Sequence, residues 1–115
     1  MDKLIIYRID SLLEHINLVL SDTKGLSIEE ISENSVLFRA TCFSVAQIGE
    51  MMIQLQNKIS NLYPDLPWYA ARKMRNVIVH DYGGTNIEDV YSTIKNDLPI
   101  LKAVFLRIKA EIEKL

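Results

Sequence analysis

The stretch that decides the fold reads SVLFRATCFSVAQIGEMMIQLQNKISNL, residues 35–62. Its large apolar side chains recur in steps of three and four residues, at Val45, Ile48, Met52, Leu55, Ile59 and Leu62. This spacing places them on one side of an α-helix. Gly49 interrupts the middle of the run, although glycine inside a helix costs ~1 kcal/mol relative to alanine. We therefore predict a long helix whose glycine permits close contact with another helix.

The residues before this stretch favour two further helices. Apolar side chains between residues 5 and 20 recur at the same spacing, which predicts a first helix that ends near Gly25. Ser27 and Glu30 have the spacing of a capping box, which marks the start of a helix. A short second helix should therefore begin at this serine. The long helix should begin after Asn34 or the serine that follows it.

The residues after the long stretch predict three more helices. Pro67 suits a first helical turn, where its missing N–H is harmless, and this helix should run to about His80. A helix capped by Thr85 or Asn86 and a final apolar helix should follow, separated by a break or kink at residues 97–99. No alternating strand pattern is present. The sequence thus predicts an all-α, antiparallel helical bundle with short loops.

Length and composition are those of one small domain. The chain has 115 residues, of which 49% are hydrophobic, so we expect a single domain spanning residues 1–115 around one core. A domain of this size has little core to spare, and pairing with a second copy would help it. No apolar run approaches the ~20 residues of a membrane span, and no signal peptide is present. The single cysteine, Cys42, excludes an intrachain disulfide, so the expected location is cytoplasmic.

Charge is unevenly distributed along the chain. The net charge of −2 excludes a strong overall attraction to nucleic acid. From Lys58 to His80, however, four basic residues face one acidic residue, whereas from Asp81 to Asp97 four acidic residues face one basic residue. The basic surface is therefore confined to one segment.

Polar side chains interrupt the apolar pattern of the segment 67–80. Arg75 lies on the same stripe as Trp68, and a guanidinium in an apolar row is costly unless it finds an anion or a polar cleft. The adjacent face of the helix carries four residues spaced four, three and four apart: Tyr69, Lys73, Asn76 and His80. Tyr82 follows shortly afterwards. This concentration of polar groups makes the segment the candidate site.

Each of these residues also has a purely structural interpretation. Arg75 could serve only as an ion-pair partner for Glu50 or another acid. His80 could only stabilise a helix C-terminus, where an imidazolium is favourable by ~0.3–1 kcal/mol. Tyr82 could close the end of the bundle. The remaining polar residues of the segment could be solvated surface groups: Arg72, Lys73 and Asn76. No spacing of histidine and cysteine suits zinc, and we expect neither metal nor cofactor.

The pattern Arg75-Asn76-x-x-x-His80-x-Tyr82 resembles the R-x4-H-x-Y motif of HepT-like HEPN toxins. These toxins are the ribonuclease partners of MntA-type minimal nucleotidyltransferase antitoxins. The resemblance spans most of the chain, because the following segments also match the family: Ile48-Gly49-Glu50, Tyr63-Pro64, Pro67-Trp68 and Asn96-Asp97-Leu98-Pro99. The residues on either side of Gly49-Glu50 differ from the small residues usual in the family.

The resemblance implies a helical bundle that forms a two-fold homodimer, with the motif helices of both subunits meeting in a composite active site. It implies metal-independent RNA cleavage by a toxin of a type VII-like toxin–antitoxin system. It also implies neutralisation by a cognate MntA-like nucleotidyltransferase, which AMPylates the motif tyrosine, here Tyr82.

The residue types suit this chemistry. RNA carries its own nucleophile, the 2′-OH, and the imidazole of His80 could accept its proton or protonate the leaving 5′-oxygen. Arg75 could bind the phosphate through two parallel N–H donors and stabilise its developing charge. Asn76 could orient the imidazole or the phosphate. Lys73 and Arg72 could hold flanking phosphates of the RNA, which would make binding sensitive to salt.

Two other functions fit the same sequence. HEPN-like bundles also resemble non-catalytic adaptors or substrate-binding partners of nucleotidyltransferases, which bind without cutting. A purely structural oligomeric bundle is the third interpretation. The combination of Arg75 with His80 favours the nuclease, because a scaffold needs neither side chain.

Overall fold

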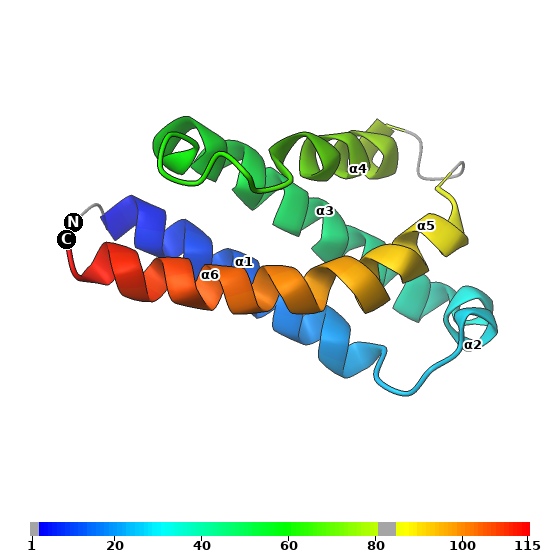
Figure 1. Ribbon diagram of the computed structural model, residues 1–115. Coiled ribbons are helices and arrows are strands. Elements are labelled where there is room, and N and C mark those ends of the chain that lie inside the picture. The colour runs from blue at the N-terminus through cyan, green and yellow to red at the C-terminus, as the bar shows by residue number, and fades with distance from the viewer. Residues whose placement is uncertain (1–2, 81–84) are drawn as a thin grey trace.

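The computed structural model describes residues 3–80 and 85–115, and all regular structure in these ranges is helical (Figure 1). In chain order the elements are α1 (Lys3–Asp22), α2 (Ile28–Glu33), α3 (Ser35–Ile59), α4 (Trp68–His80), α5 (Ile87–Ser92), the π-helical turn η2 (Thr93–Asp97) and α6 (Leu98–Glu113). The predicted all-α class is confirmed. α3 and α6 both run antiparallel to α1, and α4 folds back antiparallel to α3 on its outer side (Figure 1).

The predicted helix starts carry the expected caps. The Ser27 Oγ accepts a hydrogen bond from the Glu30 N–H at 3.1 Å, and the Ser27 N–H donates to Glu30 Oε1 at 3.0 Å, which completes the capping box of α2. Asn34 caps α3, and Asn86 caps α5. After α1, Gly25 has a φ of 75°, a conformation that favours glycine. Local sequence signals therefore fix where these helices begin.

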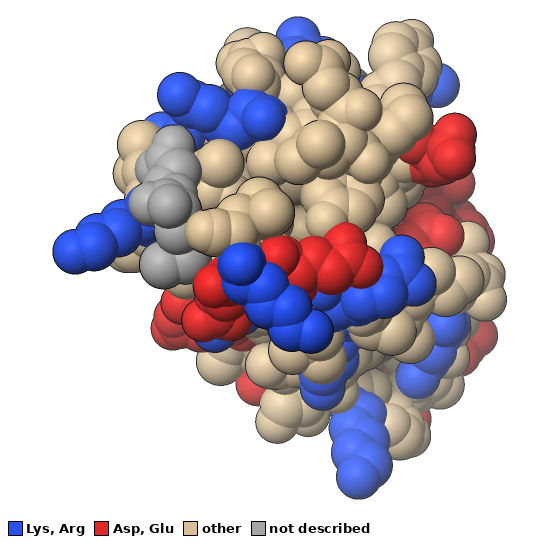
Figure 2. All heavy atoms as spheres, turned by 60° about the vertical axis from the view of Figure 1, so that its left-hand side comes forward, with Lys and Arg blue, Asp and Glu red and all other residues tan. Residues whose placement is uncertain are grey.

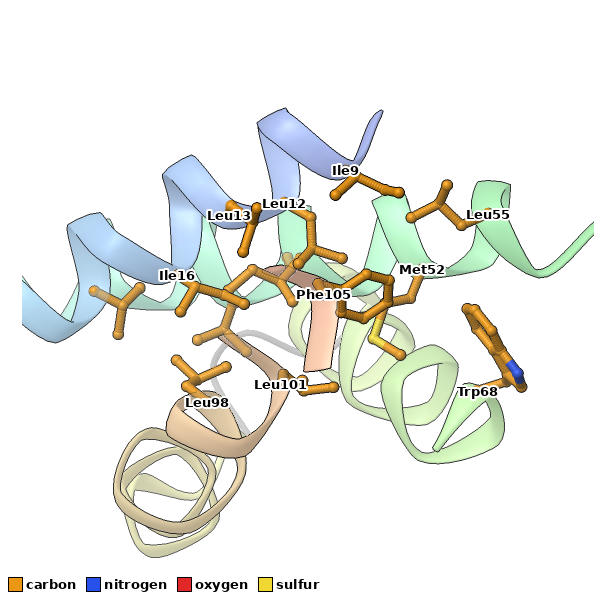
Figure 3. Close-up of a cluster of buried hydrophobic side chains, with 14 of the residues drawn as sticks. Ile9, Leu12, Leu13, Ile16, Met52, Leu55, Trp68, Leu98, Leu101 and Phe105 are labelled. Atoms are coloured by element: carbon orange, nitrogen blue, oxygen red, sulfur yellow. The ribbon is translucent and has the colours of Figure 1, made fainter. Parts of the chain in front are cut away.

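The core lies between α1, α3 and α6. Figure 3 shows their buried side chains pointing toward one another around Phe105, which has no solvent exposure. α4 contributes only Trp68 and Ile78 to the buried residues. The Trp68 indole N–H donates to the carbonyl oxygen of Tyr63 at 3.0 Å, which ties the start of α4 to the preceding turn. α4 therefore rests on α3 and leaves most of its surface to solvent.

The helix ends differ from the expectations in two places. α3 ends at Ile59, so Leu62 lies beyond the apolar stripe and is 62% exposed. The sequence predicted a break or kink at residues 97–99: a break is absent, because the backbone stays helical from Ile87 to Glu113, and the irregularity is the π-helical turn η2 that ends at Asp97. Pro99 is the second residue of α6 and directly follows the π-helical turn, where the regular α-helical hydrogen-bond pattern is already interrupted.

α3 is, by length and composition, the one helix among the described residues that could cross a membrane, with a mean hydropathy of 1.3 in its most apolar window. Its packing accounts for this composition, because α1 and α4 both cover it. It also carries the charged residues Arg39, Glu50 and Lys58 along its length.

Candidate active site on α4

The position of α4 depends on a glycine in α3. A Cβ added to Gly49 would lie 2.8 Å from the carbonyl oxygen of Ala71 and 2.8 Å from the Cβ of Arg75. Real Cβ atoms essentially never approach other atoms so closely, so any larger residue would push α4 outward. The close helix contact predicted from this glycine is confirmed. It places the base of the Arg75 side chain directly against α3.

Arg75 pairs with an acidic residue of α3. Its Nε lies 3.4 Å from Glu50 Oε2, so the ion pair with Glu50 considered from the sequence is present. This Nε is shielded from solvent, and the geometry of its contact with the carboxylate is not that of a hydrogen bond. The other oxygen of Glu50 accepts a hydrogen bond from Gln54 Nε2 at 3.2 Å. The Arg75 side chain is still 26% exposed, so the pair is reachable from solvent and worth at most ~1 kcal/mol to stability.

The other candidate residues on α4 face solvent. His80 is the last residue of the helix, and within the described part of the chain neither its side chain nor that of Asn76 makes a hydrogen bond or ion pair. Lys73 is exposed as well, and Arg72 donates from Nη2 to Gln56 Oε1 at 3.3 Å. Tyr82, the expected AMPylation site, lies outside the described residues. Glutamines 54 and 56 were not selected from the sequence, although Gln54 follows Glu50 by one helical turn.

One chain does not bring Arg75 and His80 together. Five residues on an α-helix correspond to a rotation of about 140° and a rise of ~7.5 Å. Arg75 accordingly faces α3, whereas the His80 side chain is exposed to solvent, and within the described residues no hydrogen bond joins the two side chains. Asn76, rotated by about 100° from Arg75, lies between the two directions. A phosphate held by Arg75 would need an imidazole from elsewhere.

A separate hollow of about 400 Å³ lies between α3, α4 and α6. Its lining is mostly apolar and includes Ile48, Met52, Met74, Leu101 and Val104. Only two acidic residues join it, and neither Arg75 nor His80 does, so this hollow does not suit a phosphate. Figure 2 shows that uncharged side chains form a broad continuous area on the surface, bordered by a band of acidic and basic side chains.

Two other chemistries find no support in the described ranges. No group of three or more His, Cys, Asp or Glu side chains that could hold a metal ion is found in residues 3–80 and 85–115. Cys42 is 1% exposed, and burial raises the pKa of its thiol to about 11. The thiol therefore stays protonated near neutral pH and is no nucleophile. Cys42 therefore packs as a small buried hydrophobe.

Comparisons with known proteins agree with the motif. The chain matches the model of the family described as ribonuclease HepT-like over residues 12–108. It is 26% identical to a probable ribonuclease HepT of Thermococcus cleftensis over 101 residues, which cover 88% of this chain and 92% of that protein. It is 28% identical to a protein of Methanocaldococcus jannaschii whose name gives RNase activity as a prediction, with coverage of 89% and 84%. No solved structure matches the chain significantly. Because the family model covers most of its length, the chain belongs to the HepT-like ribonuclease family.

Proposed function

We propose that this protein is a metal-independent endoribonuclease that acts as a homodimer and serves as the toxin of a toxin–antitoxin pair in the cytoplasm. The observation that carries the proposal is the arrangement on α4. Arg75 is anchored yet reachable from solvent, and the exposed His80 side chain has no hydrogen-bond or ion-pair partner among residues 3–80 and 85–115. Membership of a ribonuclease family supports RNA as the substrate.

The reaction needs only groups that this chain and the RNA supply. One imidazole accepts the proton of the 2′-OH, whose oxygen attacks the adjacent phosphorus. The bond from phosphorus to the 5′-oxygen breaks, and a second, protonated imidazole gives its proton to that oxygen. The products are a 2′,3′-cyclic phosphate and a free 5′-OH. Arg75 binds the non-bridging oxygens and stabilises the charge that develops on them.

Two copies of α4 supply what one copy lacks. A two-fold contact repeats each residue once, so an acid and a base both come from His80 and its symmetry mate. Such a contact also brings the Arg75 of one subunit toward the imidazole of the other. The separation of Arg75 from His80 within one chain supports this composite site.

The remaining polar residues of α4 extend the site. Asn76 lies between the directions of Arg75 and His80 and can orient a phosphate or the imidazole. Lys73 and Arg72 are exposed on the same helix and suit flanking phosphates of the RNA. If each of these two side chains neutralises one phosphate, the affinity for single-stranded RNA depends more steeply on salt. Each contact contributes ~0.7 to the slope of log K against log of the salt concentration.

Regulation in this proposal acts on Tyr82. A cognate MntA-like nucleotidyltransferase would transfer AMP from ATP to the phenol oxygen and release pyrophosphate. The added phosphate and nucleoside would place negative charge and bulk two residues from His80, where the RNA must lie. Cleavage would then stop without any change in the bundle.

The test of the nuclease is RNA cleavage in the presence of EDTA. Arg75→Ala and His80→Ala should each lower the rate by roughly 10²-fold or more, as expected for loss of a charge-stabilising or proton-transferring group. The matched control is His15→Ala, which removes the other histidine, half-buried against Ser44 in the α1–α3 contact. Undiminished cleavage by His80→Ala would remove this residue from the mechanism.

The dimer and the modification have separate tests. The specific activity should fall on dilution as the dimer dissociates, and the mass in solution should fall with it. Incubation with the cognate nucleotidyltransferase and ATP should add the mass of AMP to the wild type but not to Tyr82→Phe. Modification that persists in Tyr82→Phe would place the AMP elsewhere.

A non-catalytic adaptor of a nucleotidyltransferase is the second candidate. It is favoured by the apolar hollow beside α4. Expression in a growing culture separates the two functions. The nuclease should arrest growth, and His80→Ala should relieve the arrest, whereas an adaptor should have no effect that depends on this histidine.

A further inference from the structure

We propose that Glu50 is a positioning residue of the nuclease: it holds Arg75 by the Nε so that the two terminal nitrogens are directed at the RNA phosphate. This inference rests on the proposed function, because it assigns a role within the same site. Glu50 does not touch the reacting atoms and acts only through Arg75.

The base of the Arg75 side chain is fixed by the backbone of α3. Since Gly49 has no side chain, the Cβ of Arg75 lies against the α3 backbone at that position, within 2.8 Å of where a Cβ would be. The arginine thus starts from a defined point and direction. Only its outer bonds remain to be oriented.

Glu50 supplies that orientation from the next position of α3. Its Oε2 lies 3.4 Å from the shielded Nε of Arg75. Its Oε1 is itself held by the hydrogen bond from Gln54 Nε2. Because Gln54 fixes one carboxylate oxygen of Glu50, the other oxygen keeps a defined position beside Arg75. The ion pair therefore limits rotation of the guanidinium about the outer bonds of the arginine side chain.

The contact leaves the productive edge of the guanidinium open. Arginine has five N–H donors in a planar fork, and the Nε carries only one of them. Within the described residues, the terminal nitrogens of Arg75 have no hydrogen-bond or ion-pair partner. Two parallel donors on one edge match two oxygens of a phosphate.

The charge of Glu50 makes the role distinguishable from a binding role. A carboxylate beside the site repels the RNA, so it weakens binding while it improves alignment. Removing it should therefore lower kcat without raising KM, whereas loss of a direct RNA contact should raise KM. A merely structural role would lower the apparent kcat only in proportion to the folded fraction and leave KM unchanged, so kcat is calculated per folded enzyme.

The experiment compares Glu50→Ala, Glu50→Gln and the matched control Glu14→Ala, which removes one exposed carboxylate from α1. Cleavage is measured at saturating and limiting RNA, and circular dichroism gives the folded fraction. Glu50→Ala should lower kcat by roughly 10- to 100-fold with KM unchanged or reduced, as expected for a misplaced group. Glu50→Gln keeps the shape of the side chain but removes the charge that attracts the guanidinium, so it should also lower kcat. Glu14→Ala should match wild type.

A double variant separates this inference from the proposed function. In an Arg75→Ala background, Glu50→Ala should cause no further loss, because the group it positions is gone. An equal further loss would overturn the positioning role, as would a rise in KM in the single variant. If Arg75→Ala itself cleaves normally, the proposed function fails. If Arg75→Ala is impaired and Glu50→Ala is not, only the inference fails.

Discussion

Gly49 and Arg75 show how one atom decides a helix contact. At position 49 a methyl group would meet both the backbone and the side chain of α4 at 2.8 Å. The absence of a side chain in α3 therefore sets the distance between the two helices. It also sets the direction in which the guanidinium leaves α4.

Gly49→Ala tests whether the missing side chain sets the distance between α3 and α4. Helix propensity alone would stabilise α3 by ~1 kcal/mol. Overpacking against α4 typically costs ~1–3 kcal/mol, and both contacts are with atoms that cannot swing away. We expect a net decrease in the free energy of unfolding, measured by urea titration. A variant more stable than wild type would show that α4 can shift away from the added methyl group without loss of stability.

The burial of the Cys42 thiol can be tested by its reactivity. Burial raises the pKa of the Cys42 thiol to about 11. In the native state the thiol therefore stays protonated at pH values between the ordinary thiol pKa and about 11, where the unfolded chain carries a thiolate. The thiolate is the reactive form, so alkylation of the native protein at pH 9 should be far slower than that of the urea-unfolded chain. The measurement is the rate of mass increase with iodoacetamide. Equal rates in the two states would contradict the burial.

At the scale of the element, the sequence predicted helix starts better than helix ends. The side chains of Ser27, Asn34 and Asn86 bind N–H groups two or three residues away, so the signal for a start is local. Leu62 continued the apolar spacing of α3, yet the helix ends before it, and a turn held by the hydrogen bond from the Trp68 indole N–H to the Tyr63 carbonyl oxygen follows. The π-helical turn has no such local signal either.

The candidate site follows the same division. The spacing of polar residues placed Arg75, Asn76 and His80 on one helix, and that helix exists. Glu50 was one of several acids that could pair with Arg75, because spacing along one helix does not say which helix lies opposite. Only the packing of α3 on α4 selected it. The composite site stays a prediction.

Ser27→Ala tests the capping box of α2. The substitution removes the acceptor for the Glu30 N–H and should cost ~1 kcal/mol of stability. The matched control is Ser32→Ala, an exposed serine within the same helix, which should change stability by less than about 0.5 kcal/mol. Denaturant titration of both variants gives the comparison. Equal effects of the two substitutions would mean that the cap contributes nothing.

For the whole molecule, stability depends on the contact of α1, α3 and α6, whereas the candidate site lies on α4 outside it. Ile9, Met52 and Phe105 are fully buried, and they come from those three helices. Substitutions on the solvent face of α4 should therefore change activity without unfolding the bundle. This separation makes the kinetic variants interpretable.

Phe105→Ala tests the core. Removing a fully buried ring leaves a cavity among three helices and should lower the free energy of unfolding by ~3–5 kcal/mol. The neighbouring Leu106 is 51% exposed, so Leu106→Ala serves as the control and should cost under ~1.5 kcal/mol. Thermal and urea unfolding measure both. Similar losses in the two variants would place the core elsewhere.

The π-helical turn at Thr93–Asp97 has a consequence for how the chain can change in length. A π-turn holds one residue more than the α-helical path that it replaces. Deleting the exposed Asn96 can therefore restore a regular helix while α5 and α6 keep their orientation, whereas a deletion in the middle of α3 rotates everything after it by about 100°. The bundle should therefore tolerate the deletion of one residue better in this turn than in the middle of α3.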